Sequence, residues 1–306
     1  MEGLLGIEGL DRAEIEAILA RAKYFQPLQN QSFKRLDTLR GKMIVNLFFE
    51  ASTRTRTSFE IAAKRLGADA VSISASGSSV SKGESLVDTL NTLAAMRPNA
   101  IVMRHSASGA PHFLARHLPI PIINAGDGTH EHPTQALLDA RTILDRRPKL
   151  EGLRVAIIGD IAHSRVARSN VHLLSKFGVD IVLCGPAPLL PPELQQIAPG
   201  VTLTNDICQA IRQADVIMML RVQLERQHES SFPAGEYFQF FGLRLEHIEL
   251  AKPDVIVMHP GPINRGRELS SEVADSQRSV ILNQVENGIS VRMAVLERII
   301  GEQTSN

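Results

Sequence analysis

The sequence predicts an α/β protein made of two doubly wound parallel-sheet domains joined by long helices. At 306 residues the chain is long enough for two domains, each with its own core. Short apolar runs alternate with stretches of helical spacing almost to the end, a pattern typical of parallel sheets covered by helices on both faces. We expect one domain over residues 1–133 and about 284–306, and the other over residues 134–283.

The first domain is expected to begin with a helix whose N-terminus carries a capping box, with Asp11 as the N-cap and Glu14 as its reciprocal partner. Its strands are predicted from apolar runs, at residues 43–49, 70–74, 100–104 and 121–124. Its further helices are predicted from apolar residues at helical spacing, at residues 58–66, 85–96 and 111–117.

A long helix at residues 135–147, stopped by Pro148, is expected to lead into the second domain. The strands of that domain are predicted at residues 154–158, 180–184, 201–204, 216–220 and 255–258. Its helices are predicted at residues 163–177, 192–197, 206–213 and 243–250. The hydrophilic segment 223–235 is expected to form a loop, and 280–300 a helix interrupted at Gly288 that packs on the first domain.

The composition is that of an ordinary globular protein, with 43% hydrophobic and 22% charged residues. Lysine plus arginine equals aspartate plus glutamate, 33 each, so the chain lacks the global basic field expected of a nucleic-acid-binding protein. Cys184 and Cys208 lack the spacing of a metal site and are interpreted as small buried hydrophobes in a reducing compartment. Without a signal-like start or a long apolar run, the expected location is the cytoplasm and no membrane contact is expected.

An anion site is predicted where the first apolar run meets its helix. The run ends in Ser52, Thr53, Arg54 and Thr55, which place hydroxyls and a guanidinium beside the unpaired amides of a helix N-terminus. The alternative is a simple N-cap with a solvated arginine. A cap needs one such residue, whereas this turn carries six consecutive polar positions, so the pattern favours an anion site.

Polar residues also follow several other predicted strands, where doubly wound sheets bind ligands. They are 104–105, 124–132, 160–165, 221–223 and 259–262. Arg54, Arg104, Arg165 and Arg221 lie at or just beyond strand ends, which indicates a site for more than one anionic group.

The segment 128–135 permits two interpretations. His130, Glu131 and His132 could ligate a metal, but the sequence offers no distant ligand to complete the set, and no metal is expected. Pro133 fits the first turn of a helix, which places His132 near its N-cap and Gln135 in the first turn. We favour the interpretation that the His132 imidazole donates to a carbonyl oxygen while Gln135 binds a carbamoyl-like group.

Two motifs fall short of nucleotide-binding loops. The segment 158–165 follows a strand but lacks the later glycines of a dinucleotide fingerprint, so Arg165 fits a carboxylate clamp better. The segment 81–84 lacks the strand-to-helix junction of a phosphate loop, and Gly83 follows Lys82 where a hydroxyl residue is required.

Together these residues closely resemble the aspartate/ornithine transcarbamoylase family over essentially the whole chain. The matching motifs, in the family's order, are Ser52-Thr-Arg-Thr-Arg56, Ser81-Lys-Gly-Glu84, His132-Pro-Thr-Gln135, Arg165, Arg221-Val-Gln223 and His259-Pro-Gly-Pro262. The resemblance departs at Gly261, where better-known members carry leucine, and the following Ile-Asn-Arg-Gly266 is similar to the branch that sometimes assembles with dihydroorotase or an inactive relative of it.

The resemblance implies that the chain transfers the carbamoyl group of carbamoyl phosphate to L-aspartate, an early step of pyrimidine biosynthesis, without metal or cofactor. It assigns the phosphate to Ser52, Thr53, Arg54 and Thr55, the carbonyl oxygen to Thr55, Arg104 and His132, and the carbamoyl amino group to Gln135, with backbone near Gly261 and Pro262. It assigns the aspartate carboxylates to Arg165 and Arg221, assisted by Gln223 and Lys82.

The resemblance also implies a homotrimer with shared active sites. Ser78 and Lys82 would enter the site of the neighbouring subunit, and Glu50 would pair with Arg226 when the domains close. A regulatory chain or dihydroorotase is a possible further partner. Two alternatives remain: transfer to ornithine or another amine, and a non-catalytic scaffold. The His259-Pro-Gly-Pro262 segment and the second cation at Arg221 favour aspartate.

Overall fold

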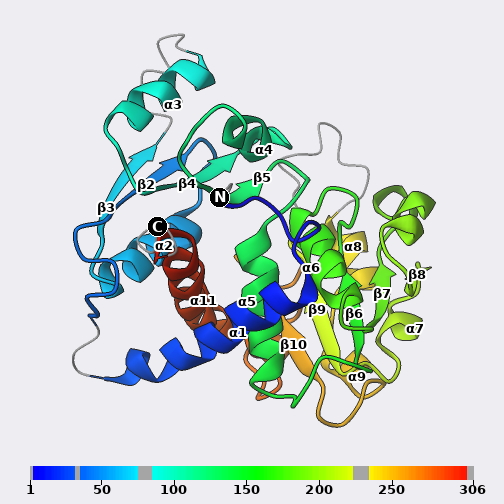
Figure 1. The fold of residues 1–306 in the computed structure, drawn as a ribbon. Helices are drawn as coiled ribbons and strands as arrows, with labels where there is room; N and C mark the ends of the chain where they lie inside the picture. The colour runs from blue at the N-terminus through cyan, green and yellow to red at the C-terminus, as the bar shows by residue number, and fades with distance from the viewer. Residues whose placement is uncertain (1–2, 32–34, 75–84, 223–233, 302–306) are drawn as a thin grey trace. The chain divides into compact units, whose positions relative to one another are not determined.

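The structure of the chain, a computed structural model, describes residues 3–31, 35–74, 85–222 and 234–301 (Figure 1). The chain folds into two compact units, one of residues 1–141 and 286–306 and the other of residues 142–285. Each contains a five-stranded sheet whose neighbouring strands are all parallel, which confirms the predicted α/β architecture. The division between the units falls inside two helices, α5 (Pro133–Leu144) and α11 (Ile281–Gly301), whereas the expected boundaries lay at about 133 and 284.

The sheet of the first unit has the order β1–β5–β4–β2–β3. Its strands are β1 (Gly3–Leu4), β2 (Met43–Phe48), β3 (Asp69–Ser74), β4 (Ala100–His105) and β5 (Ile122–Asp127). Strand β1 was not predicted, because two residues are too few for a periodic pattern. The chain places β3 on one side of β2, and β4 and β5 on the other, so the strand order reverses between β2 and β4.

Helices cover both faces of this sheet. They are α1 (Arg12–Phe25), α2 (Thr53–Arg65), α3 (Leu86–Ala95), α4 (Ala110–Ala115), and the parts of α5 and α11 that belong to the unit, with a 3-10 turn at Gln26–Asn30. The predicted capping box of Asp11 and Glu14 opens α1. Alternate sheet residues such as Leu47 and Met103 pack with Leu90 of α3 and Leu114 of α4, and α2, α5 and α11 lie on the opposite face (Figure 1).

The sheet of the second unit has the order β10–β9–β6–β7–β8, so it reverses between β6 and β9. Its strands are β6 (Arg154–Ile158), β7 (Asp180–Cys184), β8 (Val201–Thr204), β9 (Val216–Met219) and β10 (Ile256–Met258). Its helices are α6 (Arg165–Ser175), α7 (Ile207–Ile211), α8 (Ala234–Phe241), α9 (Leu245–Ile248) and α10 (Ser271–Ala274). None of the helices in the described ranges combines the length and apolar character that a membrane span needs.

Three predictions about elements were wrong. The segment predicted as a helix at 192–197 is a 3-10 turn, Pro192–Gln196, since prolines at 191 and 192 withhold backbone donors. The expected loop at 223–235 ends earlier, because α8 begins at Ala234, while residues 223–233 lie outside the described ranges.

Helix α11 runs through Gly288 without the expected interruption. A Cβ at Gly288 would lie 2.6 Å from Nη1 of Arg292 and 3.3 Å from Cδ2 of Leu138. The glycine therefore makes room for side chains packed against the helix rather than ending it.

Candidate active site

In the first unit, predicted site residues follow three adjacent strands. Ser52–Thr55 follow β2, Arg104 is the penultimate residue of β4, and His132 follows β5 at the start of α5. Because β2 pairs with β4 and β4 with β5 in parallel, these residues lie along the edge of the sheet formed by the carboxyl ends of its strands. The edge includes the reversal between β2 and β4, the place where open α/β sheets bind ligands.

The turn from β2 into α2 has the features of an anion site rather than of a simple cap. Ser52 occupies the N-cap position, yet its side chain makes no capping hydrogen bond. Thr53 and Arg54 are exposed and Thr55 is buried. The N-terminal amides of this 13-residue helix thus receive no capping bond from the Ser52 hydroxyl.

Arg104 lies beside Glu50 at the same edge. Its Nη2 donates to Oε1 of Glu50 over 2.7 Å, and its Nη1 donates to the carbonyl of Ala125 over 3.4 Å. Both side chains of the ion pair are mostly buried, at 12% and 21% exposure, which strengthens the charge-assisted bond. Glu50 was expected to pair with Arg226, which lies outside the described residues, so that pairing remains a prediction.

His132 and Gln135 are held by the first turn of α5. Both are buried, and the backbone amide of Gln135 donates to the backbone carbonyl of His132 over 2.9 Å. The side-chain nitrogen Nε2 of Gln135 donates to Oδ1 of Asp139 over 2.9 Å. Because an ionised carboxylate only accepts hydrogen bonds, Asp139 determines which end of the Gln135 amide faces it.

In the second unit, the two predicted carboxylate-binding arginines follow adjacent strands. Arg165 is the first residue of α6, which follows β6, and Arg221 lies two residues beyond β9. Strands β6 and β9 pair in parallel on either side of the reversal in strand order. A Cβ on Gly159 would lie 2.8 Å from Cβ of Leu220, so only glycine permits this close approach of the two strand ends.

The segment after β10 is fixed by a buried glutamate. Oε1 of Glu268 accepts hydrogen bonds from the amide of Val222 and from Nδ2 of Asn264, and Oε2 accepts from the amide of Asn264. Glu268 is fully buried, and burial raises the pKa of its carboxyl in spite of these bonds. It therefore ties the backbone beside Arg221 to the segment that carries Gly261 and Pro262.

The turn at Gly261 has its own constraints. Nδ1 of His259 accepts the amide hydrogen of Gly261 over 2.8 Å, and the amide of His259 donates to Gln284. Gly261 has φ of +69°, a left-handed conformation that favours glycine, and a cis peptide joins it to Pro262. These contacts explain locally why glycine stands at this position.

Sequence reasoning missed two residues of the site and four others cannot be placed. Asp139 lies four residues beyond Gln135 on one helix, and that spacing is a signal that could have identified it. Glu268 carries no such signal, since Asn264, four residues before it, does not lie on a helix, and its other partner, Val222, is 46 positions away. Four residues that were predicted to bind aspartate, to reach a neighbouring subunit or to close the domains lie outside the described ranges. They are Ser78, Lys82, Gln223 and Arg226.

Comparison with protein families gives two adjoining matches. Residues 3–145 match the carbamoyl-P binding domain of aspartate/ornithine carbamoyltransferase, and residues 151–299 match the Asp/Orn binding domain of the same enzymes. Together these two domains account for most of the chain.

Characterised relatives give the same result. The chain is 85% identical over 299 residues to the aspartate carbamoyltransferase catalytic subunit of Solibacter usitatus, covering 98% of this chain and 99% of that one. It is 56% identical to the catalytic subunit of Syntrophotalea carbinolica, covering 97% and 95% of the two chains.

Solved structures of both ornithine and aspartate carbamoyltransferases share the fold of this chain. Ornithine carbamoyltransferase from Pyrococcus furiosus matches with a TM-score of 0.89 at 31% identity, covering 98% of this chain and 97% of that one. Aspartate transcarbamoylase from Trypanosoma cruzi in complex with carbamoyl phosphate and aspartate matches with a TM-score of 0.84 at 31% identity, covering 97% and 95%. The fold alone therefore does not distinguish the two acceptors.

Proposed function

Because the chain belongs to the aspartate/ornithine carbamoyltransferase family, we propose that it transfers the carbamoyl group of carbamoyl phosphate to L-aspartate. The products are N-carbamoyl-L-aspartate and phosphate, in an early step of de novo pyrimidine biosynthesis. The observation that carries the choice of acceptor is the presence of two arginines, Arg165 and Arg221, in the segments that follow the neighbouring strands β6 and β9. The 85% identity to a catalytic subunit named for aspartate supports the same choice.

The first unit would bind carbamoyl phosphate. The phosphate would occupy the N-terminus of α2 and bind its amides, the hydroxyls of Ser52–Thr55 and the Arg54 guanidinium. The carbonyl oxygen would take hydrogen bonds from Thr55, Arg104 and His132. Since Nε2 of Gln135 is engaged by Asp139, the amide oxygen of Gln135 would accept the carbamoyl NH₂ group.

The second unit would bind the acceptor. A dicarboxylate needs two cations, and each of Arg165 and Arg221 offers a planar fork that fits one carboxylate. Gln223 and Lys82 would assist. Ornithine carries one carboxylate and a cationic side chain, so a second arginine would oppose its binding.

The reaction needs neither a covalent nucleophile nor a metal step. The amine of aspartate attacks the carbamoyl carbon, and negative charge develops on the carbonyl oxygen. Thr55, Arg104 and His132 stabilise this charge, a contribution of about 3 kcal/mol for each well-placed donor. The C–O bond to phosphate then breaks, the leaving phosphate takes up the proton that the amine loses, and the resulting phosphate dianion would be held by Arg54 and the α2 amides. Alignment of the two substrates by the arginines supplies much of the remaining acceleration.

The proposed assembly is a homotrimer in which each site is shared. Ser78 and Lys82 would reach the neighbouring subunit's site, and Gly261 and Pro262 would contact the carbamoyl group through their backbone. Glu50 would exchange its contact with Arg104 for Arg226 as the two units close on substrate. A dihydroorotase or a regulatory chain would be a further partner.

Replacing one carboxylate clamp tests the choice of acceptor. We expect Arg221→Ala to raise the KM for aspartate by roughly 100-fold or more, since a charged hydrogen-bonded pair is lost. Carbamoyl phosphate binding, measured by calorimetry, should stay within about twofold because all its proposed side-chain ligands lie in the other unit. Arg212→Ala, an exposed arginine of the same unit, is the matched control. An equal loss of affinity for both substrates in Arg221→Ala, or turnover of ornithine instead of aspartate by the unmodified chain, would contradict the proposal. If the unmodified chain is folded but forms no N-carbamoyl-aspartate, the scaffold alternative would be favoured.

A further inference from the structure

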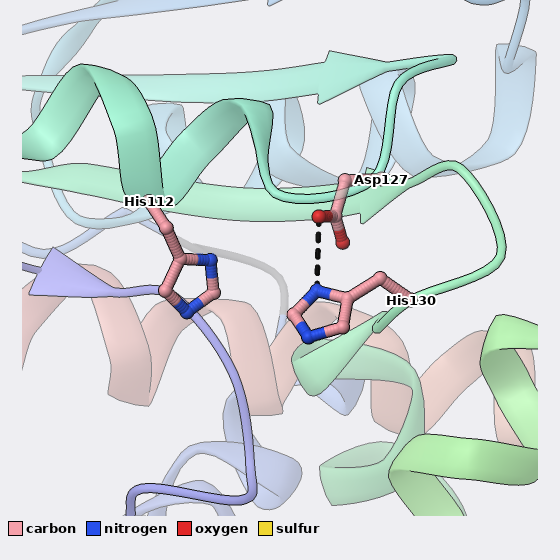
Figure 2. A group of neighbouring side chains, drawn as sticks. All are labelled: His112, Asp127 and His130. Atoms are coloured by element: carbon pink, nitrogen blue, oxygen red, sulfur yellow. Dashed lines mark hydrogen bonds and ion pairs between the residues drawn. The ribbon is translucent and has the colours of Figure 1, made fainter.

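A second cluster of chemically competent side chains lies outside the substrate-binding residues. His112 of α4, Asp127 at the end of β5, and His130 in the turn before α5 each offer a ligand atom, and these atoms lie within 4.8 Å of one another (Figure 2). The sequence alone offered His130 no distant partner, because His112 is 18 positions away. The packing of α4 against β5 in the first unit brings the three together.

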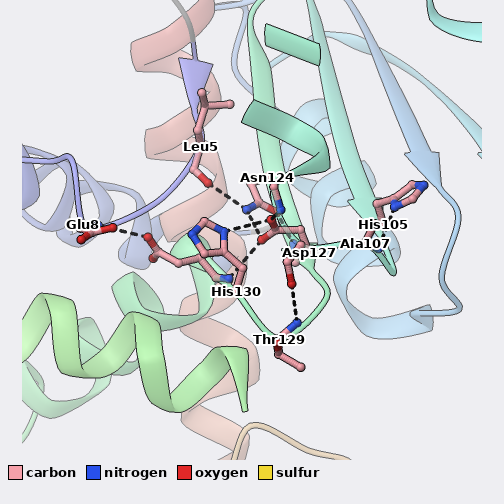
Figure 3. Close-up of polar contacts among 12 residues, drawn as sticks. Leu5, Glu8, His105, Ala107, Asn124, Asp127, Thr129 and His130 are labelled. Atoms are coloured by element: carbon pink, nitrogen blue, oxygen red, sulfur yellow. Dashed lines mark hydrogen bonds and ion pairs between the residues drawn. The ribbon is translucent and has the colours of Figure 1, made fainter. Parts of the chain in front are cut away.

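The carboxylate of Asp127 is held rigidly. Asn124 and the amide of Glu131 donate to its Oδ1 over 2.8 and 3.1 Å. The amide of Gly109, immediately before α4, donates to its Oδ2 over 2.6 Å. Asp127 is fully buried, and Figure 3 shows it in one hydrogen-bonded group with Asn124 and His130. Such fixed orientation by surrounding donors is typical of a metal ligand.

The histidines complete the cluster from two sides. Nδ1 of His130 lies 3.0 Å from Oδ2 of Asp127, and this bond raises the pKa of the imidazole. The His112 ring meets the His130 ring edge to face, with centroids 5.3 Å apart. In Figure 2, Nδ1 of His112 lies on the side of its ring that faces Asp127 and His130.

A hydrogen-bonded pair explains Asp127 and His130 but leaves His112 unexplained. Nδ1 of His112 is buried, and no residue in the described ranges forms a hydrogen bond with it. A buried polar atom without a partner costs roughly 1–3 kcal/mol, so a water or an ion bound to Nδ1 of His112 would lower the free energy. The field here also favours a cation, since Glu131 and Glu8 act on His130 together with Asp127.

We propose that His112, Asp127 and His130 form a binding site for a divalent transition metal of the zinc class. Two imidazole nitrogens and one carboxylate oxygen match the ligands that zinc prefers, with the fourth position left to water. Donor atoms on a tetrahedral zinc ion lie about 3.3 Å apart, and Asp127 and His130, 3.0 Å apart, are already close to that separation. Atoms up to 4.8 Å apart must close in by at most about 1.5 Å, and we expect rotation of the His112 ring to bring its nitrogen closer. The proton on Nδ1 of His130 moves to Nε2 of the same ring or to solvent as the metal takes its place.

The metal would brace the turn that leads to His132. Thr129 already donates to Oγ of Ser108, and a Cβ on Gly128 would lie 2.3 Å from the same atom, so this turn packs tightly on the segment before α4. A metal bound to α4, β5 and the turn at once would join all three. We therefore assign it a structural role, separate from the transfer reaction.

Metal binding to the full-length chain tests the proposal. The protein is stripped with a chelator and titrated with Co²⁺, whose visible absorption reports coordination geometry, and then with Zn²⁺ in competition. We expect one ion per chain, intense bands of a four- or five-coordinate site, and a higher thermal unfolding midpoint with Zn²⁺.

Three variants separate this site from adventitious binding. His112→Gln and His130→Gln should each weaken binding on the order of 100-fold or more and abolish the zinc-dependent thermal shift. His117→Gln, an exposed histidine whose Nδ1 contacts the carbonyl of Phe113, should bind like the unmodified chain. Equal binding by all three variants, or spectra of an octahedral ion only, would overturn the proposal. Circular dichroism of the stripped variants establishes that any loss is not due to unfolding.

Discussion

The proposed recognition of a carbamoyl group depends on the orientation of one side-chain amide, that of Gln135. Asp139 accepts from Nε2 of Gln135, and both side chains are buried on α5. Asp139 in turn acts on Arg292, a fully buried arginine of α11 that lies over the Phe59 ring. Burial lowers the pKa of Arg292 to about 9, and the charge of Asp139 opposes this shift. A buried cation thus acts electrostatically on the carboxylate that orients the Gln135 amide.

Asp139→Asn should weaken carbamoyl phosphate binding by reversing that amide. The new Asn can donate to Oε1 of Gln135, which would turn the Gln135 NH₂ toward the carbamoyl NH₂ and replace an attraction by a clash of donors. We expect a loss of at least about 1 kcal/mol, or roughly fivefold in Kd by calorimetry, with the KM for aspartate little changed.

A double-mutant cycle tells whether Asp139 acts through Gln135. The variant that carries both Asp139→Asn and Gln135→Ala should bind carbamoyl phosphate no more weakly than Gln135→Ala alone. Additive losses would show that Asp139 affects the site by another route, such as the loss of its charge beside Arg292.

At the level of secondary-structure elements, Glu268 connects two loops that the proposed aspartate site requires. It joins Val222, beyond β9, to Asn264, beyond β10, through three hydrogen bonds. Three bonds to one buried carboxylate hold these loops in register without a covalent link. The position of Arg221 relative to Gly261 therefore depends on a residue that touches neither.

Glu268 should also make stability depend on pH. Burial raises the pKa of its carboxyl in the folded state above the unfolded value. At a pH between these two pKa values, the carboxyl is therefore protonated in the folded state and ionised in the unfolded state. The contribution of Glu268 to stability is therefore present in full below the unfolded pKa and falls as pH rises toward the folded pKa. Above about pH 4.5 the unmodified chain should lose stability relative to Glu268→Gln as pH rises. Chemical unfolding of both proteins in parallel across this range measures the difference, and a constant difference would contradict the argument.

Much of this architecture could be predicted from local pattern. The strands from β2 onward and the helices α1 to α7 repeat apolar residues at the periods of their structures, and polar residues near the ends of β2, β4, β6 and β9 indicated the candidate site. What escaped prediction depends on packing. Gly288 resembles a break until Leu138 and Arg292 are seen against it, and the contacts of Glu268 and of His112 join residues distant in sequence.

For the molecule as a whole, each unit carries the reversal of strand order that binds a ligand in open α/β sheets. The candidate phosphate site stands at one reversal and the arginine pair at the other, so the two substrates are assigned to separate units. Helices α5 and α11 both continue from one unit into the other, which gives two covalent connections between the half-sites. The proposed reaction between the two substrates would therefore depend on both units.

The proposed trimer extends this dependence to neighbouring chains. If each site takes Arg54 from one chain and Lys82 from its neighbour, Arg54→Ala and Lys82→Ala should each be inactive alone yet complement each other. An intact site takes Arg54 from a Lys82→Ala chain and Lys82 from a neighbouring Arg54→Ala chain. In a cyclic trimer that contains both variants, the two chains follow one another in this order at one of the three sites. Random reassembly of an equal mixture should therefore recover about a quarter of the unmodified activity.

The control for that experiment is the same mixture without dissociation and reassembly, which should stay inactive. Two variants within one half-site, Arg54→Ala and Thr55→Ala, should likewise fail to complement after reassembly, since both residues come from the same chain. Recovery near a quarter for the first pair and none for the second would locate Lys82 in the neighbouring chain's site. Absence of recovery in hybrids shown by native mass spectrometry to contain both variants would mean that each chain builds its site alone.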